Sequence, residues 1–359
     1  LDAVESLQGA PLPASLLETQ ILPARLARYS PADLDTLIAA GEIVWCGCDS
    51  LGERDGRIAL YLADRVADLL PPRLASGEPL NPRENAILAE LARAGALFFS
   101  QLHESIGDGY PGETVDALWS LVWHGLVTND TLHALRAWIA RPEASRSSKR
   151  VHNQLAFRSR RTTPASAQGR WTLVPATART TAAEQTAWSH AIAQQLLHRY
   201  GIVTRETVAQ ENLPGGFSAV YDMLKALEAQ GRVRRGYFIA GLGGAQFAQP
   251  SAVDLLRSLR SADPERPEVI ALAATDPANP WGSILRWSEP EGPSASLSRS
   301  VGATVILRNG DLVAYLRRNN PAIQVFLPTD EPDRAAAARD LAAFLFQMAQ
   351  ELLQNPDTR

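Results

Sequence analysis

The hydrophobic and polar positions repeat one arrangement three times along the chain. An amphipathic helix ends at a glycine, and a short β-type segment of apolar and charged residues follows at once. The helices are expected over residues 32–40, 114–124 and 217–230, and the glycines are Gly41, Gly125 and Gly231. Glycine just after a helix permits the backbone turn that leads directly into a strand. Shorter helical segments precede each unit, so we predict three helix-turn-helix units with β-hairpins, which are winged helices.

The three units differ in how complete the pattern is. Residues 1–80 are expected to form a winged-helix module, with a helix over 16–27 that Pro23 kinks or divides. Residues 176–262 form another, and their glycine-rich turn at 241–244 marks the clearest wing. In residues 81–140 the chain after Gly125 soon enters a new helix at 132–140. This pattern predicts a degenerate winged-helix module with a poor wing.

Residues 141–175 break the pattern and are expected to be a basic linker. Ser, Thr and Ala fill much of this stretch, and Glu143 is the one acidic residue among many basic ones. The cations are Arg141, Arg146, Lys149, Arg150, Arg158, Arg160, Arg161 and Arg170. Two interpretations remain open. The stretch is either a solvated connection between domains or a strap that contacts phosphates.

The remainder of the chain alternates like a sheet. Four strand-like runs lie between residues 269 and 327, and Asn309-Gly310 between two of them is a strong hairpin turn. We expect a small β-rich domain over 263–330 and a C-terminal helix over 331–359. The predicted fold class is therefore α+β, with tandem winged-helix modules, a small β-rich domain and a C-terminal helix.

Composition places limits on function without defining it. The length of 359 residues predicts several domains, and the 45% hydrophobic content is that of an ordinary soluble protein. Two cysteines in so long a chain predict a cytoplasmic location. The net charge is −4. Any DNA-binding surface must then be a local basic patch. Cys46 and Cys48 would share one face of a strand and fit a reducing compartment. The first residue is Leu, which favours a fragment of a larger protein.

Several enzyme motifs are missing from this sequence. It has no phosphate-binding G-x-x-x-x-G-K-[ST] loop, no H-E-x-x-H pair and no G-x-S-x-G elbow. The two cysteines lack the C-x-x-C spacing of zinc sites, and no metal is expected. What remains is binding chemistry and one kind of carboxylate site.

The third module gathers most of the candidate DNA-binding residues outside the basic linker. They lie on its third helix and wing and are Phe217, Lys225, Arg232, Arg234 and Arg235. Each phosphate contact would release counterions, so binding would depend steeply on salt. The competing interpretation is an exposed wing whose charges serve only solubility.

Several short motifs resemble the C-terminal region of bacterial Lhr (large helicase-related) DNA helicases. The most specific are Gly215-Gly216-Phe217-Ser218, 231–238 and Thr275-Asp276-Pro277-Ala278-Asn279-Pro280. Others are Leu22-Pro23-Ala24-Arg25, the strand at Trp45, Asp55-Gly56-Arg57, Gly169-Arg170-Trp171 and Arg199-Tyr200-Gly201. The resemblance spans nearly the whole chain. It implies an ATP-dependent 3′-to-5′ DNA translocase in DNA repair, with an ATP- and Mg²⁺-using motor upstream of Leu1. Arg25, within one of these motifs, joins the candidate DNA-binding residues with Arg158, Arg160 and Arg161.

Residues 16–21 are also similar to the start of AlkZ-type winged-helix DNA glycosylases. That family uses a Gln-x-Gln or Gln-x-Asp pair to position water against the sugar, and the matching positions here are Glu18 and Gln20. The resemblance implies glycosylase activity on uracil or alkylated bases, in which a carboxylate stabilises an oxocarbenium-like state. Glu18 departs from the family's Gln. Two residues apart on a helix, Glu18 and Gln20 do not share a face, so both are alternatively plain surface. Asp276 is a further catalytic candidate, although Asp before Pro also favours a turn.

A different class of function competes with these expectations. Winged helices also pack against proteins, and the acidic net charge suits a non-catalytic interaction and oligomerisation module. The expected partners are therefore single-stranded or duplex DNA, the upstream helicase core of the same polypeptide, or a second copy of the chain.

Overall fold

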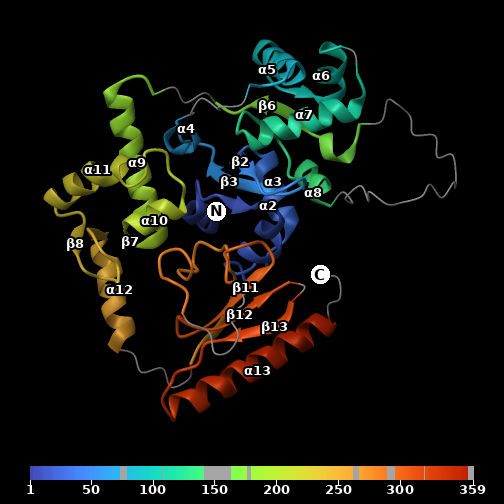
Figure 1. The fold of residues 1–359 in the computed structure, drawn as a ribbon. Helices are drawn as coiled ribbons and strands as arrows, with labels where there is room; N and C mark the ends of the chain where they lie inside the picture. The colour runs from blue at the N-terminus through green and yellow to red at the C-terminus, as the bar shows by residue number, and fades with distance from the viewer. Residues whose placement is uncertain are drawn as a thin grey trace. The chain divides into compact units, whose positions relative to one another are not determined.

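The computed structural model divides into two compact units. Figure 1 shows the helices and strands along the chain. Unit 1 comprises Leu1–Glu18 and Arg28–Glu184, and unit 2 comprises Thr19–Ala27 and Gln185–Arg359. The structure describes residues 1–72, 79–107, 109–140, 163–175, 179–261, 267–288, 296–318 and 320–354. No helix in these ranges is long and apolar enough to cross a membrane.

The first winged helix begins the chain. Its elements are α1 (Asp2–Leu7), β1 (Leu12–Pro13), α2 (Ala14–Leu16), the π-helix η1 (Leu17–Ile21), α3 (Pro31–Ala39), β2 (Ile43–Ser50) and β3 (Gly56–Leu62), with α4 (Val66–Leu69) following. The antiparallel sheet has the order β1-β3-β2. Gly41 has a φ of 76° where α3 gives way to β2, as the helix–glycine–strand pattern predicts. The helix expected over 16–27 ends at Ile21 instead, and Pro23 lies in a turn.

The second module has the three-stranded sheet of a winged helix. Its elements are α5 (Pro82–Ala94), β4 (Leu97–Phe98), α6 (Phe99–Ser105), α7 (Pro111–Trp123), β5 (Val127–Asn129), α8 (His133–Ile139), the 3₁₀ turn η2 (Ala165–Ala167) and β6 (Arg170–Leu173). The sheet order β4-β6-β5 matches that of the first module. The expectation of a poor wing was wrong, because β6 comes from the stretch expected to be a linker. Asn129 on β5 pairs with Trp171 on β6, and a pattern confined to adjacent residues does not show so distant a partner.

Unit 1 has a tryptophan-rich core. Eight of the 13 residues of α7 are buried, and this helix packs against β2 of the first module. Trp119 is fully buried, with its ring centroid 5.1 Å from that of Trp138 and 5.6 Å from that of Trp123. A Cβ on Gly47 would lie 2.0 Å from the carbonyl oxygen of Val122, so only glycine fits there. The third helix of this module is therefore part of the core.

The third winged helix repeats the same topology. Its elements are α9 (Ala182–Tyr200), β7 (Ile202–Val203), α10 (Arg205–Gln210), α11 (Ser218–Ala229), β8 (Arg234–Gly236) and β9 (Gln246–Ala248), with α12 (Pro250–Ser261) following. The sheet order is β7-β9-β8. Arg199 and Tyr200 both hydrogen-bond to Glu211, and burial raises the pKa of Tyr200. Only three of the 12 residues of α11 are buried.

A four-stranded antiparallel sheet and a long helix complete the chain. The strands β10 (Val269–Ala273), β11 (Ala303–Arg308), β12 (Asp311–Arg317) and β13 (Asn320–Val325) follow one another in sequence order, and α13 is Asp333–Gln354. Asn309 and Gly310 have φ values of 50° and 90° in the β11–β12 turn, as the Asn-Gly pair predicts. Apolar residues of α13 pack on the sheet at Ile306 and Val313. The predicted α+β class with tandem winged helices is confirmed.

The two cysteines lie in β2 but do not share a face. Cys46 is buried and Cys48 is exposed, and the two do not form a disulfide bond. The strand register shifts between Gly47 and Asp49, so an extra residue turns the following side chain over. The alternation expected for a regular strand was wrong here.

Candidate nucleic-acid interface and carboxylate sites

The wing of the third module presents unpaired cations. Arg232 and Arg234 are exposed, and neither forms an ion pair or hydrogen bond with another described residue. Tyr237, at the end of β8, is 89% exposed, which is rare for so large an aromatic side chain. Guanidinium groups beside an exposed aromatic ring suit a phosphate backbone and its bases. The sequence patterns singled out the arginines but not Tyr237.

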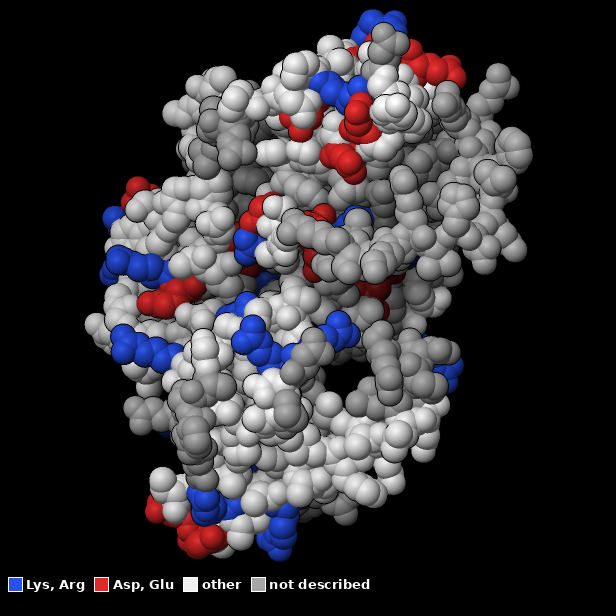
Figure 2. Space-filling model, turned by 45° about the vertical axis from the view of Figure 1, so that its right-hand side comes forward, with Lys and Arg blue, Asp and Glu red and all other residues white. Residues whose placement is uncertain are grey.

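The other candidates of this module are partly engaged. Arg235 pairs with Glu228 at 3.2 Å, and Lys225 lies 3.9 Å from Asp222. Phe217 is half-buried at the N-cap of α11, 5.5 Å from the ring of Tyr221, so it contributes mainly to packing. Lys and Arg side chains lie in small groups among acidic and uncharged ones on the face drawn in Figure 2. The cationic surface is local, as the net charge of −4 requires.

Arg25 and Asp276 form a buried pair within unit 2. The two guanidinium nitrogens of Arg25 donate to the two carboxylate oxygens of Asp276 at 2.8 and 2.7 Å. Asp276 is 1% exposed, and its Oδ1 also accepts from the backbone N–H of Ala278 at 2.7 Å. Arg25 Nη1 also donates to the carbonyl of Ile21 at 2.8 Å. The structure thus pairs the DNA-binding candidate Arg25 with the catalytic candidate Asp276. The positive charge of one balances the negative charge of the other.

Glu18 lies in a second charge cluster, within unit 1. Arg136 donates to both of its oxygens at 2.6 and 2.8 Å and also contacts Asp35. The hydroxyl of Tyr29 donates to Glu18 at 2.5 Å, and burial together with this hydrogen bond raises the pKa of Tyr29. The same carboxylate, by its hydrogen bonds, raises the pKa of Arg136. Both Glu18 oxygens are therefore occupied, and Arg136, the partner 118 residues away, had no local sequence signal.

Gln20 differs from Glu18. It is half-buried in η1, and its side-chain amide makes no hydrogen bond with the described residues. A π-helical turn is rare and often occurs at functional sites.

The predicted DNA-binding residues Arg158, Arg160 and Arg161 lie outside the described residues.

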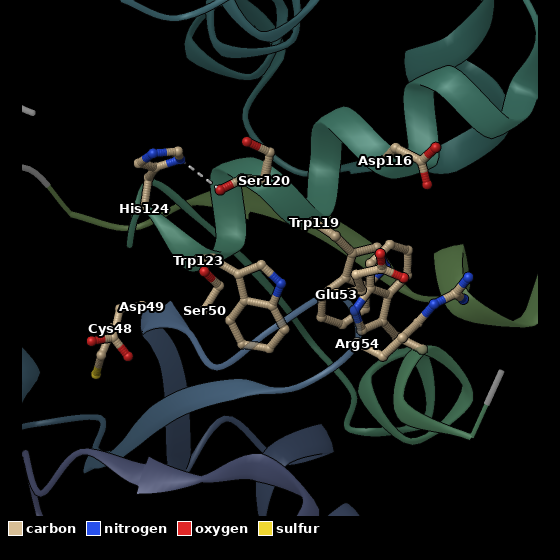
Figure 3. Close-up of a pocket in the computed structure, with 11 residues that line it drawn as sticks. Cys48, Asp49, Ser50, Glu53, Arg54, Asp116, Trp119, Ser120, Trp123 and His124 are labelled. Carbon is tan, nitrogen blue, oxygen red and sulfur yellow. Dashed lines mark hydrogen bonds between the residues drawn. The ribbon is translucent and has the colours of Figure 1, made fainter. Parts of the chain in front are cut away.

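The sequence patterns did not reveal a pocket in unit 1 (Figure 3). It has a volume of about 710 Å³ and lies between the loop that joins β2 to β3 and the helix α7. Trp119 and Trp123 line it from α7, and Trp138 lines it from α8. Polar side chains surround this indole floor, with Glu53 and Arg54 on the loop and Asp116 on α7. The one signal in the sequence is the four-residue spacing of Trp119 and Trp123, which places both on one helix face.

No group of three or more His, Cys, Asp or Glu side chains in the described ranges could hold a metal ion. The carboxylates identified above are paired with arginines or lie apart from one another.

Three winged helices of one topology, followed by a small sheet, define a tandem winged-helix protein. Residues 1–63 and 182–268 each match a family described as the winged-helix domain of the large helicase-related protein. The chain belongs to this Lhr family and corresponds to the C-terminal part of its longer members.

Two relatives show the extent of this similarity. A protein of Mycolicibacterium smegmatis named Lhr helicase/probable uracil glycosylase is 40% identical over 354 residues, covering 93% of this chain and 23% of that protein. A protein of Escherichia coli named Lhr helicase/uracil glycosylase is 38% identical over 351 residues, covering 91% of this chain and 22% of that protein. The chain thus spans less than a quarter of each relative.

Proposed function

We propose that this chain is the DNA-binding C-terminal region of an ATP-dependent 3′-to-5′ DNA helicase that acts in DNA repair. The observation that carries the proposal is the wing of the third module, where Arg232, Arg234 and Tyr237 are all exposed. A wing with unpaired guanidinium groups attracts phosphates, and counterion release drives that association. The motor, with its ATP and Mg²⁺, would lie in a part of the polypeptide beyond this chain.

Salt-dependent DNA binding tests the proposal. Single-stranded and duplex oligonucleotides are titrated with the chain at several salt concentrations, and the slope of log K against log salt is measured. The double variant Arg232→Ala, Arg234→Ala is expected to lower the slope by about 1.8 for duplex DNA if each arginine contacts one phosphate. The matched control is Arg257→Ala, an exposed arginine of α12. A slope near zero for the unaltered chain, or equal slopes for the double variant and the unaltered chain, would contradict the proposal.

We further propose that the chain removes a uracil or alkylated base from DNA. Both relatives carry uracil glycosylase in their names, and Glu18 and Gln20 match the catalytic positions of the AlkZ-type resemblance. Water would add to C1′ of the sugar while the C–N bond to the base breaks and the base leaves with a proton. Because Glu18 has both oxygens occupied, its role would be electrostatic stabilisation of the cationic transition state. Gln20, with a free amide, would orient the water.

Strand cleavage after alkaline treatment measures base removal. The unaltered chain is expected to release uracil, and Glu18→Gln and Gln20→Ala are expected to slow release about 100-fold, as loss of one stabilising group does in other enzymes. Asp276→Asn is a separate test of the remaining carboxylate. The control is Asp254→Asn, on the exposed face of α12. Full activity in both Glu18→Gln and Gln20→Ala would exclude these positions as the catalytic pair.

One observation favours the alternative, a non-catalytic interaction or oligomerisation module. Leu255 and Leu259 lie four residues apart on α12 and are 60% and 64% exposed. Such a pair forms an apolar stripe that another helix can cover. Sedimentation of this chain tests self-association, and Leu255→Ser with Leu259→Ser would abolish it if this stripe is the contact. If the chain is monomeric and binds DNA, the oligomerisation alternative fails and the DNA-binding proposal stands.

A further inference from the structure

We propose that the tryptophan-lined pocket of unit 1 binds a neutral nucleobase that carries a carbonyl group beside a ring N–H. The inference rests on the proposed function, because a base excised from DNA must leave the stack and enter a pocket. It assigns a base-binding role to residues of α7, α8 and the β2–β3 loop, which the Glu18–Gln20 resemblance does not include.

Indole side chains line the inner wall of the pocket. Trp123 and Trp119 extend from α7 toward the strands below, and Glu53 and Arg54 lie in front of Trp119 (Figure 3). The volume of about 710 Å³ lies in the range of small-molecule sites. Trp119 is fully buried, and Trp123 and Trp138 are 9% and 7% exposed, so a ring would contact only the small exposed parts of the indoles. Trp119 packs against the rings of Trp123 and Trp138, which fixes the positions of these side chains. The wall of the pocket that they form is therefore preorganised.

Two buried donors lack acceptors at this pocket. Trp138 is only 7% exposed, and its indole N–H has no partner among the described residues. One guanidinium nitrogen of Arg54, Nη1, is likewise buried without a partner. An unsatisfied buried donor costs about 1–3 kcal/mol. A carbonyl oxygen on a ligand would satisfy one of these donors.

The rim supplies the complementary acceptors. Glu53 and Asp116 line the pocket, are exposed, and form no ion pair with the described residues. Each can accept a hydrogen bond from a ring N–H. Carbonyl groups and N–H groups alternate in one plane on an oxo-pyrimidine or oxo-purine ring.

The charges argue against an anionic ligand. The Arg54 guanidinium carbon lies 5.6 Å from the centre of the Trp138 ring, so the aromatic face already has a cation of its own. The lining also holds three carboxylates, those of Asp49, Glu53 and Asp116, so its charge does not by itself exclude a cationic base. The carboxylates of Glu53 and Asp116 would in turn repel a phosphate. A neutral ring that carries both carbonyl and N–H groups is favoured because it offers acceptors to Trp138 Nε1 and Arg54 Nη1 and donors to the rim carboxylates.

Tryptophan fluorescence of the full chain, titrated with free uracil, tests the assignment. Uracil is expected to give a saturable change, whereas 1,3-dimethyluracil, which lacks N–H groups, is expected to bind at least tenfold more weakly. Arg54→Leu and Asp116→Asn should each weaken uracil binding about five- to tenfold, equal to roughly 1–1.4 kcal/mol. Arg54→Lys keeps the charge and serves as a second variant, and Asp254→Asn is the matched control. Equal binding of uracil and dimethyluracil, unchanged affinity in both Arg54→Leu and Asp116→Asn, or no saturable change would overturn the proposal.

A second arm separates the free base from a base within DNA. Single strands that contain either one uracil or one abasic site are compared, since the wing of the third module would bind both backbones alike. The uracil strand is expected to bind about fivefold more tightly, and Arg54→Leu is expected to remove that difference. Equal affinity of the two strands, together with saturable binding of free uracil, would restrict the site to the free base and overturn its role in excision.

The same variants distinguish failure of the pocket from failure of the glycosylase. If the unaltered chain releases uracil from DNA and the Arg54→Leu and Asp116→Asn variants release it equally fast, the pocket assignment fails and the activity stands. If free uracil binds through Arg54 and Asp116 but no base release occurs, the activity fails and the binding site stands.

Discussion

The second and third winged helices share one topology but use their third helix in opposite ways. In the second module, α7 buries eight of its 13 residues and becomes the centre of a tryptophan core. In the third, α11 buries three of 12 and leaves a polar face beside an exposed, cationic wing. The winged-helix topology alone therefore does not identify the nucleic-acid-binding helix. The distribution of apolar residues around each helix does, because a helix that is apolar on several sides must be covered.

The largest effect is expected from Trp119→Ala. Removing a fully buried indole should lower the free energy of unfolding by about 3–5 kcal/mol. Tyr221→Ala on α11 should cost less, because Tyr221 is half-buried. Urea denaturation followed by circular dichroism measures both. Equal losses would mean that the two helices contribute equally to their cores, and the comparison would fail.

Gly47→Ala tests how closely the first two modules approach each other. The added Cβ would overlap the Val122 carbonyl, so we expect a loss of about 1–3 kcal/mol from overpacking. Gly243→Ala, in the turn of the third module, meets no atom within 4 Å and should change stability by less than about 0.5 kcal/mol. Thermal melts of the two variants give the comparison. A stable Gly47→Ala variant would show that β2 and α7 can separate without cost.

Lys225→Ala tests whether the third module contacts DNA while the second module does not. Lys225 is exposed on α11, where it has a long ion pair with Asp222 and lies 5.6 Å from the centre of the Tyr221 ring, so its loss should lower the salt slope for duplex DNA by about 0.9. Arg93→Ala makes the same change of charge on α5 of the second module and should leave the slope unchanged. Fluorescence anisotropy at several salt concentrations provides the slopes. A larger effect at Arg93 would place the DNA-binding surface on the second module.

The smallest effect is expected from Glu228→Gln. The pair with Arg235 is partly exposed, so its loss should cost under about 1 kcal/mol of stability. The freed Arg235 should instead become available to phosphate and raise the salt slope by about 0.9. Chemical denaturation and DNA titration are run on the same preparation. Weaker DNA binding in this variant would indicate that the ion pair positions the wing.

Local patterns predicted much of the fold. The glycines that end helices, Gly41, Gly125 and Gly231, all have positive φ and mark the three modules. The Asn309-Gly310 turn lies between the strands that it was expected to join. These features succeed because the causal residues lie within a few positions of one another. Strand β6 was missed, since its partners β4 and β5 are separated from it by a long stretch of chain.

The candidate site was less predictable for the same reason. Glu18 and Asp276 are carboxylates whose environment is set by Arg136 and Arg25, each more than 100 residues away in sequence. No spacing rule identifies such a partner. The pocket at Trp138 arises from three separate segments that only the fold brings together. By contrast, Arg232 and Arg234 were found because exposed wing residues depend mainly on their own strand.

The pair of Arg25 and Asp276 also affects how the polypeptide matures on the ribosome. The two residues are 251 positions apart, so at about 5–20 residues per second roughly 13–50 s of translation separate them. During that interval Arg25 lacks the carboxylate of Asp276 as a partner. A product truncated before residue 276 would lack this carboxylate and leave Arg25 without its ion pair.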